Sequence, residues 1–247
     1  MLRLLKQAIR QPEEPKLEFL CYAEDYGVIA EPVPARKVLP DWFKNLPPKI
    51  ERKDKLENST IKRCMPVLDA FNAGWILPLA ADVEIETDET GDGYQTKSKF
   101  YRPMVENHNK EQVANHPGFP FHPLKWLNYW AIKCPPEYSL LFVPPLNRYE
   151  PRFECISGMV DDTYLGNGAL EFINFPFFFK IPKYTGIIRK GTPLVQIIPV
   201  KRDFLLKSSN TVNLRKLEND DLQLINHTRN RRAAHESLYR DELRQDK

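Results

Sequence analysis

Residues 132–202 are a succession of short apolar runs separated by Pro, Gly, Asn and Asp. Runs of this length with such separators are typical of β-strands joined by turns. The last run, residues 193–200, has the composition of a strongly buried strand. These features are typical of a compact β-barrel or β-sandwich. We therefore expect a mainly β protein whose core lies in residues 132–202.

The rest of the chain adds two flanking segments to this core. The 22 prolines and 10 glycines in 247 residues favour turn-rich β structure over a flexible chain. We expect a short helix in residues 1–16 and a single β-rich domain in residues 17–206. Residues 207–247 are expected to be a charged helical tail, because residues 213–247 contain no Pro or Gly and Asn213 suits a helix cap.

Several local patterns predict particular elements within the domain. Residues 82–86 alternate between polar and apolar side chains, as a half-buried strand does. Residues 87–94 predict a hairpin loop in which Gly91 and Gly93 adopt positive φ. Residues 50–60 are polar and predict a surface loop. Residues 169–179 predict two strands that are separated at Pro176.

Charge and cysteine content restrict the partners and the compartment. A net charge of +3 with 28% charged residues is too balanced to predict nucleic-acid binding. The four cysteines form no C-x-x-C pair, which is typical of reduced thiols in a cytoplasmic protein. No apolar run approaches the roughly 18 residues of a membrane-spanning helix. The N-terminus lacks the pattern of a secretory signal.

Two apolar clusters are candidate surfaces for a partner. Residues 40–45 predict a helical turn that carries Trp42 and Phe43 and is bracketed by prolines. These rings are expected to clamp the outside of a sheet, and a docking site is the alternative. In the tail, an apolar stripe over the first helical turns includes Leu214 and Leu217.

Three histidines within 15 residues raise the question of a metal site. His108, His116 and His122 carry imidazoles, the commonest metal ligands in proteins. An iron or zinc oxygenase-like barrel would use His116 and His122. Their spacing matches no metal motif, so we expect these side chains to pack beside aromatic rings and the protein to bind no metal.

The central stretch contains an ordered set of motifs, Gly-x-Val-Asp-x-x-Tyr-x-Gly in residues 158–166, Asn174, and Lys-Gly-x-x-x-x-Gln in a segment ending at Gln196. This order resembles the β-clip fold of the dUTPases and dCTP deaminases over about a quarter of the chain. The resemblance implies a β-clip-like core and a nucleotide site. Asp161 would be the candidate catalytic residue. The ligand-binding candidates would be Asn147, Arg148, Asp161, Tyr164 and Gln196, with Mg²⁺ as a cofactor.

The sequence departs from that family where phosphate is bound. The Arg-Ser-Gly motif of the family is replaced by Pro-Leu-Asn-Arg at residues 145–148. No Gly-rich closing motif follows Gln196, and the early catalytic Asp context is missing. Phosphate binding requires backbone amide cradles or bidentate cations. We therefore expect the fold without the chemistry, and no cofactor.

Residues 34–47, 60–66 and 143–148 make the chain similar to an uncharacterised family found in tailed bacteriophages and bacteria. That resemblance implies a protein of the host cytoplasm or of the virion. The first hypothesis is a non-enzymatic, self-assembling phage structural or assembly protein, a homotrimer or larger assembly that contacts other phage proteins. The alternative is a divergent nucleotide-binding phosphohydrolase or deaminase.

Overall fold

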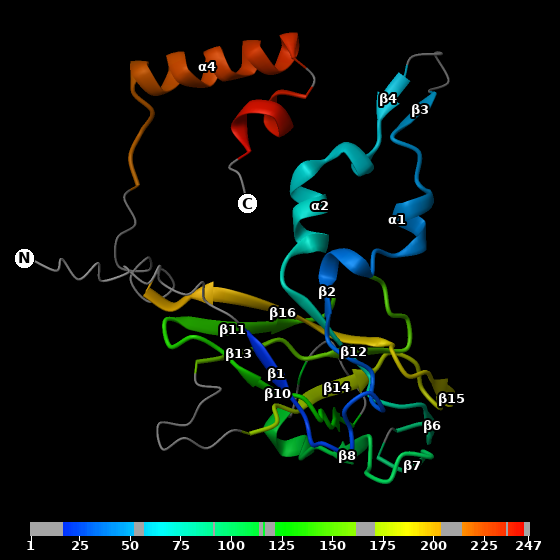
Figure 1. The fold of residues 1–247 in the computed structure, drawn as a ribbon. Coiled ribbons are helices and arrows are strands. Elements are labelled where there is room, and N and C mark those ends of the chain that lie inside the picture. Colours follow the sequence, from blue (N-terminus) through cyan, green and yellow to red (C-terminus); the bar gives the residue numbers. More distant parts are fainter. Residues whose placement is uncertain are drawn as a thin grey trace, which may run out of the picture.

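A computed structural model describes residues 17–51, 57–90, 92–113, 116, 122–161, 171–203, 214–235 and 237–244. The expected helix in residues 1–16 lies outside these ranges. The described part is mainly β: its strands pair antiparallel in five open sheets, and they form no closed barrel (Figure 1). Within the same ranges, no helix has both the length and the apolar character needed to cross a membrane.

The largest sheet has five strands in the order β13-β11-β16-β5-β2. Their bounds are β2 Val33–Pro34, β5 Trp75–Pro78, β11 Tyr138–Val143, β13 Gly158–Val160 and β16 Pro193–Lys201. The long strand β16 is central, because it pairs with β11 on one side and with β5 on the other. Residues 194–197 of β16 are fully buried. The strongly buried strand that the sequence predicts for residues 193–200 is therefore confirmed.

In the described ranges, four smaller sheets complete the fold, and the four-stranded one carries much of the aromatic core. Their strands are β8 Val105–Asn107, β9 Leu124–Trp126, β12 Phe153–Cys155 and β14 Phe175–Phe179 in one sheet, β6 Val83–Thr87, β7 Tyr94–Lys97 and β15 Thr185–Ile188 in a second, β1 Glu18–Leu20 with β10 Ala131–Lys133, and β3 Lys49–Glu51 with β4 Glu57–Ser59. The buried rings of Trp126 and Phe177 stack at 4.3 Å between centroids. Cross-strand aromatic pairs of this kind stabilise neighbouring strands.

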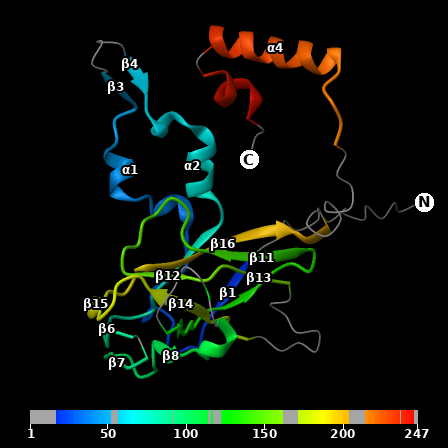
Figure 2. The ribbon, with the colours of Figure 1, turned by 180° about the vertical axis from the view of Figure 1, so that it is seen from behind.

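The helices α1 and α2 lie on one side of the five-stranded sheet, as both views show (Figures 1 and 2). The described residues form the helices η1 Ala35–Lys37, α1 Asp41–Asn45, η2 Ile61–Arg63, α2 Met65–Asn72, η3 Lys110–Val113, α4 Asn219–Ala234 and the π-helix η4 Tyr239–Leu243. Residues 214–235 and 237–244, which include α4 and η4, are called the C-terminal arm below. Figure 1 shows α4 well separated from the sheets.

Some local predictions are wrong, each for a physical reason. Residues 50–60, expected to be a loop, contain most of the β3–β4 hairpin, whose polar strands give no apolar alternation. Residues 175–179 form one strand through Pro176, at a position where Ile156 donates to the Pro176 carbonyl. Gly93 is not at positive φ. A Cβ there would lie 2.6 Å from Asp88 Oδ2, so glycine at this position allows the Asp88 carboxylate to approach the backbone closely. Gly91 lies outside the described residues.

Candidate functional site

Arg148 and Gln196, two of the residues expected to bind a ligand, lie in contact with each other. Gln196 is completely buried on β16, and its Oε1 accepts from Arg148 Nη1 at 3.3 Å and from the Leu146 amide at 2.9 Å. Its Nε2 donates to the carbonyl oxygens of Ala70 and Ala73 at 3.0 and 2.6 Å. The Gln196 side chain therefore joins β16 to the end of α2 through its Nε2 and to the turn at residues 146–148 through its Oε1.

Arg148 extends the same network to one further segment, residues 35–38, and adds another contact to α2. Its guanidinium donates to the backbone carbonyl oxygens of Ala35, Val38, Phe71 and Leu146 at 2.9–3.2 Å. It also lies over the Phe71 ring at 5.2 Å. Burial lowers the pKa of Arg148 to about 10, which still leaves the side chain charged at neutral pH. The arrangement satisfies this charge with carbonyl dipoles and fastens η1 and α2 to the sheet.

The space beside Arg148 is limited. A pocket of about 190 Å³ lies next to it, lined among others by Glu150, Glu154 and Lys180. Pockets for drug-sized ligands span roughly 300–1,000 Å³. Two carboxylates in the lining also disfavour a phosphate group. Neither the free donors nor the room that the nucleotide resemblance implies are present at this position.

Asp161 lies at the other end of β11. Its Oδ1 accepts from Ser139 Oγ at 2.8 Å, and its backbone carbonyl accepts from Arg202. Gln196, in contrast, pairs in register with Val143. The four-residue step from Ser139 to Val143 corresponds to about 13 Å of strand. The structure therefore brings Arg148 and Gln196 together but separates Asp161 from both.

Two further ligand candidates have different outcomes. Asn147 is exposed in the turn before Arg148 and has a left-handed backbone with φ 57°. Asn adopts this conformation more readily than most residues, which accounts for its place in the turn. Tyr164 lies outside the described residues, so its predicted contact with a ligand stays a prediction.

Of the aromatic pair Trp42 and Phe43, which the sequence predicts to clamp a sheet or, alternatively, to form a docking site, one member is buried. Phe43 packs on Phe71 of α2 with ring centroids 4.5 Å apart, and Trp42 lies 5.9 Å from the same ring. The clamp therefore lies on a helix, whereas the sequence predicts that it lies on a sheet. Trp42 remains 48% exposed. It is available to a partner, while Phe43 is part of the packing between α1 and α2.

The predicted tail helix exists, but it begins later than expected. Its cap is Glu218, which together with Asp221 forms a capping box, and Asn213 lies outside the described residues. Leu214 and Leu217 therefore precede α4, and they are 90% and 59% exposed. The structure describes every residue of α4, and none of them is buried. Leu222, Leu224 and Ile225 are also among the exposed apolar residues.

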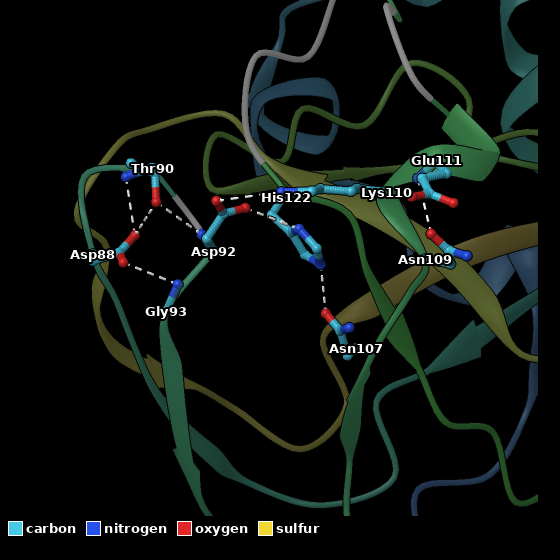
Figure 3. Close-up of polar contacts among 9 residues, drawn as sticks. All are labelled: Asp88, Thr90, Asp92, Gly93, Asn107, Asn109, Lys110, Glu111 and His122. Carbon is cyan, nitrogen blue, oxygen red and sulfur yellow. Dashed lines mark hydrogen bonds and ion pairs between the residues drawn. The ribbon is translucent and has the colours of Figure 1, made fainter.

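One of the three histidines, His122, belongs to a polar cluster at the tip of the β6–β7 hairpin, which Figure 3 shows. The two ring nitrogens of His122 lie 3.0 Å from Asp92 Oδ1 and 2.5 Å from Asn107 Oδ1. His116 lies beside the Phe178 ring at 5.8 Å, as the sequence predicts for a histidine packed on an aromatic ring. Burial, aided by Lys125 and His122, lowers the pKa of His108. Among the residues that the structure describes, no group of three His, Cys, Asp or Glu side chains is placed to hold a metal ion.

A buried ion pair in an aromatic cage is a feature that sequence reasoning missed. Asp25 is completely buried, accepts from the Tyr101 hydroxyl at 2.8 Å and pairs with Arg102. The rings around the Arg102 guanidinium are those of Tyr22, Phe100, Tyr101 and Tyr129, at 4.1–5.6 Å. Cation–π contacts of this kind stabilise a partly desolvated guanidinium. The local signal, an aromatic pair before an Arg at residues 100–102, does not reveal its distant partner.

Comparison of the sequence with protein-family models and with curated proteins found no match.

Proposed function

We propose that this chain is a non-enzymatic protein that assembles with copies of itself through the C-terminal arm. The carrying observation is that α4 buries none of its side chains while the arm exposes several large aliphatic residues. Helices of this length obtain most of their stability from packing an apolar face. The arm gains that packing when it contacts a second molecule.

A neighbouring copy of the same chain is the occupant that the charges favour. The first turn of α4 carries Asp220 and Asp221, and its last turn carries Arg231 and Arg232. Within the chain, Asp221 already pairs with Arg215, and Arg231 pairs with Glu242. Asp220 at one end and Arg232 at the other therefore supply the opposite charges that a second copy can meet. The arrangement of Arg148 and Gln196 supports the non-enzymatic part of the proposal, because their polar groups bind the protein's own backbone.

The two sequence resemblances suggest the fold of the core and the assembly in which the protein takes part. We propose a β-clip-like core, supported by the antiparallel pairing of both motif-bearing strands, β13 and β16, with β11. We also propose a homotrimer or larger assembly that serves a phage particle or its construction. Trp42 on α1 is a second exposed contact that such an assembly has available.

The solution mass of the full chain tests this proposal. We expect light scattering to give at least three times the 28.9 kDa of one chain. The double variant Leu214→Asp, Leu217→Asp should shift the mass towards a single chain, because each buried leucine contributes about 1.5–3 kcal/mol. Loss of about 3 kcal/mol weakens association roughly a hundredfold.

An exposed aliphatic residue outside the arm provides the control. Ile50 on β3 is 49% exposed, and Ile50→Asp should leave the mass unchanged. A monomeric wild-type chain at concentrations of about 100 µM, well above the Kd of a stable assembly, contradicts the proposal. If Ile50→Asp and the double leucine variant lowered the solution mass equally, assembly would not proceed through the C-terminal arm.

The nucleotide-enzyme alternative makes a separate prediction. A divergent phosphohydrolase or deaminase would release pyrophosphate or ammonia from dUTP or dCTP in the presence of Mg²⁺. We expect no turnover above that of a heat-denatured control, because Asp161 is distant from the Arg148–Gln196 pair. Turnover that Asp161→Asn abolishes would favour the enzyme instead.

A further inference from the structure

A pocket of about 700 Å³ lies between the start of α2 and the C-terminal arm. It is formed by two segments that are far apart in the sequence, residues 58–66 and residues 237–240. The described residues that line it are Asn58, Ser59, Thr60, Lys62, Arg63, Cys64, Met65, Pro66, Ser237, Tyr239 and Arg240. Its volume is within the range of roughly 300–1,000 Å³ that is typical of small-molecule sites.

The lining is cationic and rich in hydroxyl groups. Lys62, Arg63 and Arg240 contribute three positive charges, and none of the described lining residues is Asp or Glu. Ser59, Thr60, Ser237 and Tyr239 add side-chain hydroxyls, which donate hydrogen bonds to anionic oxygens. The N-terminal end of α2, at Cys64 and Met65, adds a partial positive charge.

Contacts around the pocket hold its two walls together. Arg63 donates to Ser59 Oγ at 3.1 Å and to Ser237 Oγ at 3.5 Å, so it spans both segments. Arg244, just beyond the arm's π-helix, pairs with Asp69 of α2. Within the wall formed by residues 58–66, Lys62 Nζ donates to the carbonyl oxygen of Lys44 at 2.7 Å. The Arg240 guanidinium contacts Asp241 at 2.6 Å, which orients it and offsets part of its charge.

We propose that this pocket binds a phosphorylated small molecule that carries two or more linked phosphate groups. The volume exceeds what one inorganic anion needs, and cations on both walls match a ligand with several charged groups. Arg and Lys bind phosphate through charge-assisted hydrogen bonds, which are about twice as strong as neutral ones. This site is distinct from the Arg148–Gln196 pair and does not depend on self-assembly.

Cys64 provides a direct reporter of the site. It lines the pocket and is exposed, whereas Cys155 is buried and Cys21 and Cys134 are half-buried. Inorganic pyrophosphate, used as the probe on the full chain, should slow the reaction of the Cys64 thiol with a disulfide reagent at least fivefold. Sodium chloride at the same ionic strength is the control for screening, and Cys64→Ser gives the background rate of the other thiols.

The double variant Lys62→Gln, Arg63→Gln should raise the pyrophosphate concentration needed for half-protection at least tenfold. Lys97→Gln, on an exposed strand position remote from the pocket lining, is the matched control and should change nothing. Circular dichroism shows whether each variant folds. If the double variant does not fold, the protection of Cys64 in the wild-type chain still tests the proposal.

Three outcomes would overturn this proposal. The first is no protection of wild-type Cys64 at millimolar pyrophosphate, and the second is equal protection by chloride alone. The third is protection by a single-stranded DNA oligonucleotide but not by pyrophosphate, which would assign the cations to a nucleic acid.

Discussion

Gly74→Ala is expected to destabilise the protein by at least about 3 kcal/mol, or to prevent folding. Gly74 has φ +63°, where an L side chain costs about 1 kcal/mol or more. A Cβ there would also overlap the Ile197 carbonyl oxygen and lie 2.9 Å from its carbon. Overpacking against an immovable neighbour costs a further 1–3 kcal/mol or more. Urea unfolding followed by circular dichroism measures the effect.

Gly191→Ala is the matched control for this substitution. Gly191 also has positive φ, at +87°, but a Cβ would meet nothing within 4 Å. It should therefore cost about 1 kcal/mol from the backbone conformation alone. If the two alanine variants had equal stability, the close approach between Gly74 and β16 would not limit the fold.

Gly74 also illustrates which parts of the fold the sequence predicts. The strands predicted for residues 82–86 and 193–200 are confirmed as β6 and β16, because each buries apolar side chains in a pattern that its own residues display. Gly74 itself directly precedes β5 and closely approaches Ile197 of β16. Its contact with Ile197 comes from strand pairing across more than 100 residues, which no local pattern records.

Short elements were harder to predict, because tertiary packing forms them. The eight-residue helix α2 has Pro66 in its first turn and is too short to show a clear helical periodicity. It is stabilised by Phe43 against Phe71, and by Gln196 and Arg148 at its end. These partners lie in three separate segments, so the residues of α2 alone do not predict the helix.

The candidate site shows the same limit. The sequence grouped Arg148 with Gln196, and the structure does bring them together. Their partners are mostly backbone carbonyl groups, which every residue carries and which therefore leave no signal in a sequence. The pocket between residues 58–66 and 237–240 was missed for a related reason. Its cations are unremarkable within each segment and form a cluster only when the C-terminal arm lies beside α2.

Arg148→Met is expected to cost about 3 kcal/mol or more of unfolding free energy. The substitution keeps much of the apolar stem but removes the donor from the carbonyl groups of Val38 and Phe71, whereas the Ala35 carbonyl still accepts from the Val38 amide at 3.2 Å. Each buried acceptor left without a partner costs about 1–3 kcal/mol.

Two further variants show whether stability depends on the several hydrogen-bond donors of Arg148 or only on its positive charge. Arg148→Lys should recover little stability, because a compact ammonium lacks the planar fork that reaches several carbonyls at once. Arg189→Met removes an exposed ion pair with Asp82 and should cost less than about 1 kcal/mol. Chemical denaturation of the three variants measures these differences. If Arg148→Met were as stable as the wild type, Arg148 would be available for a ligand, and the nucleotide-binding alternative would regain its main residue.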